Sequence, residues 1–359
     1  MAAEGNRTPN LNAVARMAGV STATAGRALG NYSSVRPETA ERVQHAARVL
    51  GYRPNALARG LINGATRTIG VIVTDLGNPF FSGMLKGVSQ AARREDYDVL
   101  LFDTGGDLDA EARAVKVLSE RRVDGIIAAP AALESGANFA ALTEYRVPLV
   151  LVDRPLAESG ADTVLVSNVS SAEEATAHLL GHGHRRIAVV SESDESPTSA
   201  LALAARDEPM RPATARLAGY ARAHAATGLP IDDDLHVRVP YAAERAEGAI
   251  SAFLDAHPDV TAVFTTDNVL SAAAFRSFQT TGRRCPDDVS LVGFDEHEWA
   301  TLVRPTLSVV QQPREAIGST AAERLLRRIT GADQSAPVHT ELAATLVPRD
   351  SSGPVSPAR

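Results

Sequence analysis

The sequence predicts two structural parts: an N-terminal all-α headpiece with a helix-turn-helix and a hinge helix, and a two-lobed α/β domain with parallel sheets. Two patterns predict this division. Close to the N-terminus, short amphipathic stretches flank the turn Ala18-Gly19-Val20-Ser21, and after residue 67 apolar runs alternate with helical patterns. Charge follows the same division. Residues 1–62 carry eight Arg against three Glu, a balance of +5, so the net charge of −7 leaves −12 for the remainder.

Three helices are expected in the headpiece. Asn10 caps the first, Ser21 caps the second, and Pro37 begins the third, which ends at Gly51. Gly19 gives the backbone the freedom to leave the first helix. The positions expected to face inward are Leu11, Val14, Ala15, Ala18, Ala25, Ala28, Leu29, Ala40, Val43, Ala47 and Leu50. The second helix then presents outward the residues Thr22, Ala23, Gly26 and Arg27.

The outward face of the second helix favours DNA binding over the general alternative, a three-helix bundle that binds nothing. In a helix-turn-helix, the N-terminal part of the second helix meets base edges and phosphates in the major groove. A basic headpiece neutralises phosphates, while an acidic body avoids non-specific adhesion to nucleic acid. The charge distribution therefore favours the DNA-binding interpretation.

A short hinge helix is expected after the headpiece, led by Pro54 and carrying two leucines one turn apart, the second being Leu61. Isolated helices shorter than about 12 residues are marginal in water, and Gly60 costs about 1 kcal/mol relative to Ala. Such a helix needs a partner. A second copy in a dimer supplies one if both helices lie on a minor groove and push a leucine between base steps. A solvated linker is the alternative, because Asn63-Gly64 follows directly.

Several motifs follow one another in a specific order along the chain. The headpiece and hinge contain Ala13-Val14-Ala15-Arg16-Met17-Ala18-Gly19-Val20-Ser21 and Leu50-Gly51-Tyr52-Arg53-Pro54-Asn55-Ala56-Leu57-Ala58-Arg59. The body contains Thr68-Ile69-Gly70-Val71, Asn78-Pro79-Phe80-Phe81, Gly183-His184-Arg185-Arg186, Arg216-Leu217-Ala218-Gly219-Tyr220 and Gly293-Phe294-Asp295. In this order the motifs resemble the lactose-repressor (LacI/GalR) family of bacterial transcription regulators. The resemblance covers nearly the whole chain.

The resemblance implies a sequence-specific transcription regulator, expected to be a repressor, that binds DNA as a homodimer. Two headpieces about one DNA turn apart, or a small multiple of it, predict a near-palindromic operator. Gly26 stands where the family usually has a Ser, and Gly60 replaces a helix-favouring residue of the hinge. The DNA contacts expected from pattern and resemblance together are Asn10, Ser21, Thr22, Ala23, Thr24, Arg27, Tyr52, Asn55, Ala58, Arg59 and Leu61.

The body is expected to form two lobes from βαβ units. Short apolar runs cover residues 69–73, 99–102, 126–129, 149–152, 187–190, 262–264 and 290–294. They alternate with helical patterns, which predicts parallel sheets with helices on both faces. About 290 residues exceed one ordinary sheet domain. The run 309–313 and a helix to about residue 329 are expected to return the chain to the first lobe, which gives the hinged clamshell of periplasmic binding proteins.

The domain boundaries follow from these patterns. We expect a disordered tail over 1–9, a headpiece over 10–53, a hinge and linker over 54–67, an effector-binding and dimerisation domain over 68–350, and a disordered tail over 351–359. The first lobe is expected over about 68–166 and 313–335, and the second over about 167–312 and 336–350. The segment from Ser191 to Pro212 is longer than the family's usual loop and is expected to be a mobile surface excursion.

Five apolar runs are followed by an aspartate: Asp75, Asp103, Asp153, Asp267 and Asp295. Ligands of open parallel sheets bind outside the carboxyl ends of the strands, so these carboxylates are expected to rim the interlobe cleft. A purely structural role is favoured for Asp103 and competes for Asp75. The resemblance implies ligand contacts for Arg216 and Asp295. Carboxylate acceptors beside Arg donors suit a polyhydroxylated molecule, so a sugar is the leading effector class and a nucleoside or another metabolite is the alternative.

Aromatic side chains are few, at 4% of the chain, and three are candidates for stacking on the effector. Phe80 and Phe81 follow the first strand, and core packing is the favoured alternative for Phe81. Tyr241 follows Pro240 where the resemblance places a stacking ring, whereas Ser167 replaces a common Asp of the family. The expected effector contacts are Asp75, Phe80, Phe81, Asp153, Arg154, Ser167, Arg216, Tyr241, Asp267 and Asp295.

An enzyme and a secreted solute-binding protein are the competing classes. The single cysteine, Cys285, has no expected neighbour that lowers its pKa, and Gly181-His182-Gly183-His184 lacks a third metal ligand at sensible spacing. We therefore expect no catalytic residues, no metal and no cofactor. Residues 1–9 lack an apolar signal core, and no stretch approaches the roughly 18 apolar residues of a membrane span. A cytoplasmic, nucleoid-associated protein without a membrane partner is expected.

Overall fold

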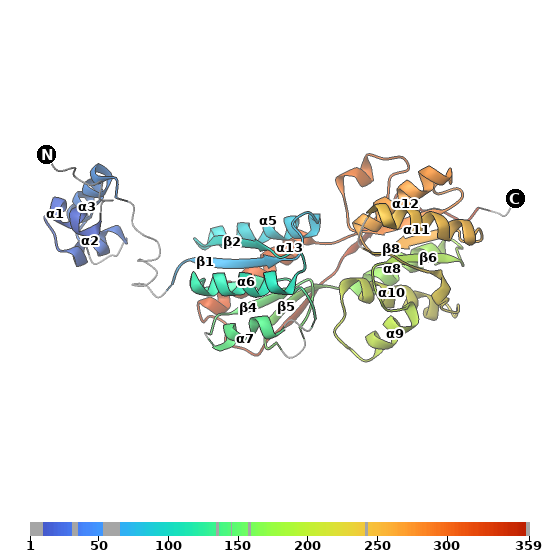
Figure 1. Cartoon of the computed structure of the whole chain (residues 1–359), viewed down its shortest axis with the longest axis horizontal. Coiled ribbons are helices and arrows are strands. Elements are labelled where there is room, and N and C mark those ends of the chain that lie inside the picture. Colours follow the sequence, from blue (N-terminus) through green and yellow to red (C-terminus); the bar gives the residue numbers. More distant parts are fainter. Residues whose placement is uncertain are drawn as a thin grey trace. The chain divides into compact units, whose positions relative to one another are not determined.

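The computed structural model describes residues 10–30, 35–52, 65–133, 136–144, 146–156, 159–240 and 243–356. The chain divides into two compact units (Figure 1). The first unit is Met1–Thr68 with Arg121–Asp124, and the second is Ile69–Glu120 with Gly125–Arg359. The first unit contains the headpiece, and the second contains two sheets.

The headpiece consists of α1 (Leu11–Ala18), α2 (Thr22–Leu29) and α3 (Pro37–Leu50). The predicted caps are confirmed, because the side chain of Asn10 accepts from the Ala13 N–H and that of Ser21 accepts from the Thr24 N–H. Gly19 ends α1 in the left-handed conformation, with φ 67°. The buried residues are Val14, Ala15, Ala18, Ala25, Ala28, Val43, Ala46 and Ala47. Four further residues that were expected to face inward are half-buried and pack against this core: Leu11, Leu29, Ala40 and Leu50.

The first sheet has the strand order β11-β5-β4-β3-β1-β2. Its strands are β1 (Thr68–Val73), β2 (Asp98–Asp103), β3 (Gly125–Ala128), β4 (Leu149–Val152), β5 (Asp162–Val166) and β11 (His339–Leu342). Pairing is parallel from β1 through β3, β4 and β5 to β11. The helices of this lobe are α5 (Pro79–Arg94), α6 (Leu108–Glu120), α7 (Gly136–Glu144) and α13 (Arg314–Ile329).

Helices α5 and α13 cross at direct backbone contact. A Cβ added to Gly318 would lie 1.9 Å from the carbonyl oxygen of Met84, and one added to Gly87 would lie 2.0 Å from that of Glu315. Only glycine permits this approach. The crossing anchors α13, a late segment of the chain, on the first lobe, as the sequence predicts.

The second sheet has the order β12-β10-β9-β8-β6-β7. Its strands are β6 (Ile187–Ser191), β7 (His236–Arg238), β8 (Ala262–Thr265), β9 (Ser290–Phe294), β10 (Ser308–Gln311) and β12 (Thr345–Val347). All pairs are parallel except β10 with β12, which is antiparallel. The remaining elements are α8 (Asn168–Gly181), α9 (Pro197–Ala205), α10 (Pro212–Ala226), η1 (Asp233–Leu235), α11 (Ala243–Ala256), α12 (Asn268–Thr281) and η2 (Glu298–Thr301).

Two predicted boundaries of the body are wrong. Residues 336–350 were expected in the second lobe, but β11 pairs with β5 in the first sheet and only β12 belongs to the second. The chain therefore passes between the sheets after β5, after β10 and after β11. The segment 191–212 is not a plain loop either. It contains α9, which Ser196 caps and which buries Ala200.

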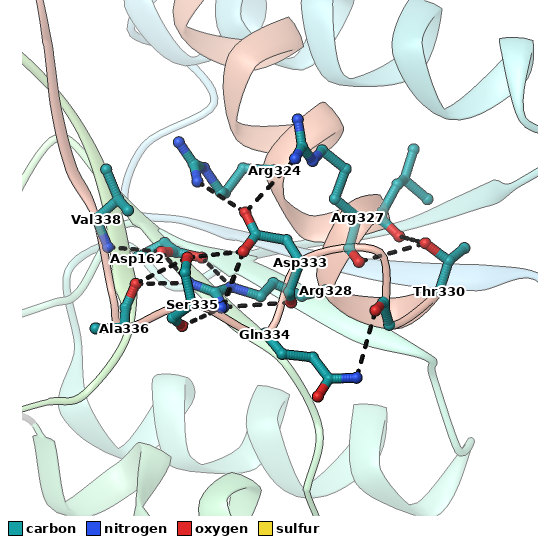
Figure 2. Close-up of polar contacts among 12 residues, drawn as sticks. Asp162, Arg324, Arg327, Arg328, Thr330, Asp333, Gln334, Ser335, Ala336 and Val338 are labelled. Atoms are coloured by element: carbon teal, nitrogen blue, oxygen red, sulfur yellow. Dashed lines mark hydrogen bonds and ion pairs between the residues drawn. The ribbon is translucent and has the colours of Figure 1, made fainter.

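A polar network secures the segment that precedes β11 (Figure 2). Arg328 near the end of α13 makes a bidentate ion pair with buried Asp162, with N–O distances of 2.7 and 2.8 Å. It also donates to the carbonyl oxygens of Ser335 and Ala336. Asp162 accepts a further hydrogen bond from the Val338 N–H, at 2.8 Å. These bonds hold the chain beside β5, so that β11 adds to the first sheet.

The expected disorder after residue 350 is also wrong for the residues that the structure describes. Ser351 is fully buried, accepts from the Ser308 N–H and donates to the Leu291 carbonyl. The Val355 N–H donates to the carbonyl of His182. These bonds satisfy backbone groups of β9 and β10, which explains the order of residues 351–356 despite their polar composition. The predicted tails over 1–9 and 357–359 lie outside the described residues.

Candidate functional site

The exposed face of α2 is the candidate DNA-binding surface. Ser21, Thr22 and Ala23 are exposed at its N-terminal end, Thr24 is half-buried, and Arg27 is exposed in its last turn. Thr22 Oγ1 donates to Asn12 Oδ1 at 2.8 Å, which fixes the start of α2 against α1. The arrangement presents small and polar side chains and one guanidinium outward, as a major-groove reading helix requires.

Other expected DNA contacts have mixed placements. Asn10 uses its side chain to cap α1, with the Ala13 N–H donating at 3.0 Å. Tyr52 is half-buried and packs against the headpiece core. The hinge helix and the expected contacts Asn55, Ala58, Arg59 and Leu61 lie outside the described residues, so these contacts stay predictions.

A second group of charged side chains gathers where strands of the two sheets end. We call Asp153, Arg154, Arg216, Asp267 and Asp295 the strand-end cluster. Asp153 follows β4 of the first sheet, whereas Asp267 and Asp295 follow β8 and β9 of the second. Asp153 and Asp295 both adopt left-handed backbone conformations, with φ of 66° and 77°. Non-glycine residues rarely adopt this conformation, and such strain is concentrated at functional sites.

Arg216 on α10 is buried and held by three contacts. Its Nε donates to Asn168 Oδ1 at 2.8 Å, and its Nη1 donates to the Thr266 carbonyl at 2.6 Å. The guanidinium carbon lies 3.7 Å from the centre of the Phe294 ring. These contacts fix the plane of the guanidinium while its charge still acts on Asp153 and Asp267.

Arg154 is fixed in a similar way. Its Nη1 donates to the carbonyl oxygens of Pro130 and Ala131, at 3.2 and 3.1 Å, and its Nε lies 3.3 Å from Asp153 Oδ2. In the second lobe, Gln312 donates a side-chain hydrogen bond to Asp295. The cluster therefore presents carboxylate acceptors and guanidinium donors in fixed orientations.

Burial perturbs two carboxyls of this cluster. Burial raises the pKa of Asp153, and the nearby charges of Asp295 and Glu192 add to the rise, while Arg154 and Arg216 oppose it. Burial and the charge and hydrogen bonding of Glu192 raise the pKa of Asp267 well above its ordinary value, against the Leu270 N–H and Arg216. Raised carboxyl pKa values at a strand end are typical of functional sites.

Several expected effector contacts have structural roles. Phe80 and Phe81 pack edge to face in the core, each with 4% of its surface exposed, which confirms the alternative prediction for Phe81 and corrects that for Phe80. Asp75 accepts from the Gly77 N–H within its own turn. Ser167 Oγ lies 3.4 Å from both Ser171 Oγ and the Leu342 carbonyl. Tyr241 lies outside the described residues.

Sequence reasoning missed four residues beside the cluster: Asn168, Glu192, Phe294 and Gln312. Glu192 follows β6 just as the predicted aspartates follow their strands. The rule that ligands bind at the carboxyl ends of parallel strands therefore also predicts Glu192. Asn168, Phe294 and Gln312 act through contacts with Arg216 and Asp295 that only the folded chain reveals.

The cysteine and the histidine that were considered as possible catalytic or metal-binding residues have structural roles. Burial raises the pKa of the Cys285 thiol to about 12, which disfavours the reactive thiolate. His184 is buried and bonds Thr261 Oγ1 and the Gly353 carbonyl. Within the described parts of the chain, no group of three or more His, Cys, Asp or Glu is placed to hold a metal ion. The same parts contain no helix with the length and apolar character of a bilayer span.

Comparison with known families identifies the class of protein. Residues 10–55 match the family described as bacterial regulatory proteins, lacI family. Residues 66–349 match the family described as periplasmic binding proteins and sugar binding domain of LacI family. The chain belongs to the LacI family of bacterial transcription regulators. The predicted helix-turn-helix headpiece and two-lobed α/β body are confirmed.

Individual relatives are also transcription regulators. The regulator CelR of Thermobifida fusca is 32% identical over 355 residues, which cover 97% of this chain and 99% of CelR. The repressor PurR of Vibrio parahaemolyticus is 32% identical over 316 residues, 88% of this chain and 90% of PurR. A CelR–cellobiose complex aligns with a TM-score of 0.69 at 30% identity, covering 96% of this chain and 99% of that one. The operator-bound lac repressor dimer shares the fold, with a TM-score of 0.80 at 24% identity, over 97% of this chain and 100% of that one.

Proposed function

We propose that this protein is a homodimeric repressor that acts in the cytoplasm on a near-palindromic operator and is not an enzyme. A small molecule bound at the strand-end cluster sets its affinity for the operator, with sugars as the leading class. The observation that carries the proposal is that the chain combines an exposed reading helix with a buried set of carboxylates and guanidiniums at strand ends.

The chemistry of the strand-end cluster supports a polyhydroxylated ligand. Asp153, Asp267 and Asp295 offer acceptors, and Arg154 and Arg216 offer donors whose planes are fixed by backbone carbonyls. Sugar hydroxyls both donate and accept, so they match such a mixed set. The similarity to a CelR–cellobiose complex points in the same direction. A nucleoside or another metabolite is the alternative that the test must separate.

The connections between the two sheets support an allosteric role. Three segments of chain join them, after β5, β10 and β11. A ligand that contacts residues of both lobes favours one relative arrangement of the lobes, and in a dimer this changes the spacing of the hinge segments that enter the headpieces. The coupling expected for such systems is about 1–3 kcal/mol.

The proposal is tested by selecting a binding sequence from random DNA duplexes and titrating the selected operator by fluorescence anisotropy. We expect a symmetric sequence whose affinity falls steeply with salt concentration. The basic headpiece neutralises DNA phosphates and thereby releases the cations that were bound to the DNA. Sugars, nucleosides and nucleobases are then added in turn, and a sugar is expected to shift the operator Kd. Failure to enrich any symmetric sequence contradicts the DNA-binding part. A shift by a nucleoside alone replaces the sugar with the alternative.

A further inference from the structure

Three neighbouring strands of the second sheet are each followed by a carboxylate at the same level. The register pairs Ile187 of β6 with Ala262 of β8, and pairs Ala262 with Ser290 of β9. Five residues further along each strand, this register brings Glu192, Asp267 and Asp295 next to one another. Neighbouring strands lie about 4.8 Å apart, so the three carboxylates form a row about 10 Å long.

The arginines near this row make their direct contacts with other groups. Arg216 acts on Asp267 through its charge, but it donates hydrogen bonds to the neutral oxygens of Asn168 and Thr266. Arg154 lies beside Asp153 of the first lobe. Asp295 accepts from the neutral amide of Gln312. Arg216 is therefore the guanidinium whose charge acts on Asp267.

Asp267 is the member of the row whose carboxylate is buried and only partly hydrogen-bonded. Its side chain is buried, with 5% of the residue exposed, and its Oδ1 accepts from the Leu270 N–H at 2.9 Å as the cap of α12. Its Oδ2 is buried and, among the described residues, accepts from no N–H or hydroxyl group. Glu192 is exposed and within hydrogen-bonding reach of Asp267. Two carboxyl groups in contact need a proton or a cation between them.

Building on the effector function proposed above, we infer that Glu192 and Asp267 form a subsite for a positively charged amino group, so that the effector is an amine-bearing sugar or a similar polyhydroxylated amine. An ammonium group has three donors. They match Asp267 Oδ2 and the Glu192 carboxylate, whereas a neutral hydroxyl donates only once and cancels no charge. The exposure of Glu192 leaves the subsite open to a ligand that enters from solvent.

The same arrangement makes the protein without ligand sensitive to pH. The groups whose charges act on Asp267 are Glu192 and Arg216, and those that act on Asp153 are Arg154, Arg216, Asp295 and Glu192. As the pH rises, Asp267, whose pKa is raised, loses its proton and its repulsion with Glu192 grows. Glu192→Gln removes this repulsion, so its Tm relative to the wild type is expected to rise between pH 5.5 and 8.

The experiment uses the full-length wild type, Glu192→Gln and the control Asp194→Asn. Asp194 is a highly exposed acid in the same loop, paired with Arg238 at the surface. Thermal shift and calorimetry compare matched probes: glucose with glucosamine, galactose with galactosamine, and cellobiose with the disaccharide of glucosamine. At least one amine-bearing member is expected to bind the wild type about tenfold more tightly than its neutral partner, because charged hydrogen bonds exceed neutral ones by roughly this factor.

Glu192→Gln is expected to lose this discrimination, and Asp194→Asn is expected to keep it. The inference is overturned if no amine-bearing probe binds more tightly than its neutral partner, or if Glu192→Gln discriminates as the wild type does. It is also overturned if Glu192→Gln and Asp194→Asn show the same change in Tm between pH 5.5 and 8. Binding of neutral sugars alone overturns the amine subsite but leaves the proposed function standing. The effector part of the proposed function fails if no small molecule alters operator affinity.

Discussion

Two groups of aspartates in the body are held in opposite ways. Asp162 at the start of β5 accepts from Arg328 and the Val338 N–H, and Asp333 beyond α13 accepts from Ser335 and lies near Arg324 (Figure 2). Asp153 and Asp267, at the carboxyl ends of β4 and β8, lie near other acids instead. The first group stabilises the fold, whereas the second keeps unfavourable interactions, which we propose that the ligand relieves.

The pKa values follow this difference. Burial opposes ionisation of Asp162, but the hydrogen bonds and charge of Arg328, with help from Val338 and Arg324, lower its pKa. Hydrogen bonds from Ser335, with nearby Arg side chains, lower the pKa of Asp333 to about 2. At Asp153 and Asp267 burial wins and the pKa values rise. One residue type therefore serves structure or binding according to how its charge is balanced.

The largest expected effect comes from removing Arg328, whose charge balances that of Asp162. Arg328→Ala leaves Asp162 buried without its bidentate partner, which is expected to cost about 3–5 kcal/mol of unfolding free energy. Urea unfolding measures this. The matched control is Arg327→Ala, because Arg327 is exposed and lies 3.9 Å from Asp333. Equal losses in the two variants would show that the Asp162 pair has no special role.

Acidification tests the same group without removing the arginine. A folded-state pKa below the ordinary 3.8 gives stability that is complete above that pH and is lost as the pH falls through the folded value, about 2 for Asp333. The stability advantage of the wild type over Asp333→Asn is therefore expected to be full at pH 6 and to shrink towards pH 2. An advantage that does not change over this range contradicts the assignment.

Asp267→Asn removes a charge from the second group of aspartates. A raised folded pKa means that stability is lost as the pH rises through it, so removing the charge is expected to stabilise the protein at pH 8. Asn also caps helices and can accept from the Leu270 N–H. Tm at pH 8 is expected to rise by about 2 °C or more, the shift that 1 kcal/mol produces in a large domain. The prediction is contradicted if the Tm of Asp267→Asn exceeds that of the wild type by less at pH 8 than at pH 5.5.

The smallest expected effect is that of Ser335→Ala. The variant removes one side-chain hydrogen bond to Asp333 and keeps the one from the Ser335 N–H. A loss smaller than that of Arg328→Ala is expected in urea unfolding at pH 7, because the bond lies near solvent. The pKa of Asp333 should rise at the same time, which a carboxyl NMR titration measures. An unchanged pKa would place the cause of its low value in the arginines alone.

Much of the fold is predictable because its signals are local. Caps such as Asn10 and Ser21 and the periodic burial of short helices depend on residues a few positions apart. The aspartates at strand ends follow from one rule about parallel sheets. That rule also applies to Glu192, which directly follows β6.

The errors concern contacts between distant segments. The pairing of β11 with β5 depends on Arg328 and Asp162, which are far apart in the sequence. The order of Ser351 depends on backbone groups of β9 and β10. Burial of Phe80 likewise depends on the complete first-lobe core. No periodicity or composition in one stretch of chain reports these long-range pairings.

The account depends most directly on coupling between the strand-end cluster and DNA. The decisive measurement is the operator Kd of the wild type and Asp295→Asn, with and without the effector found by screening, by fluorescence anisotropy. In the wild type the effector is expected to change the operator Kd by about 5–150-fold. Asp295→Asn should bind operator as the wild type does without effector and respond far less to it. An equal response in both proteins would contradict the account.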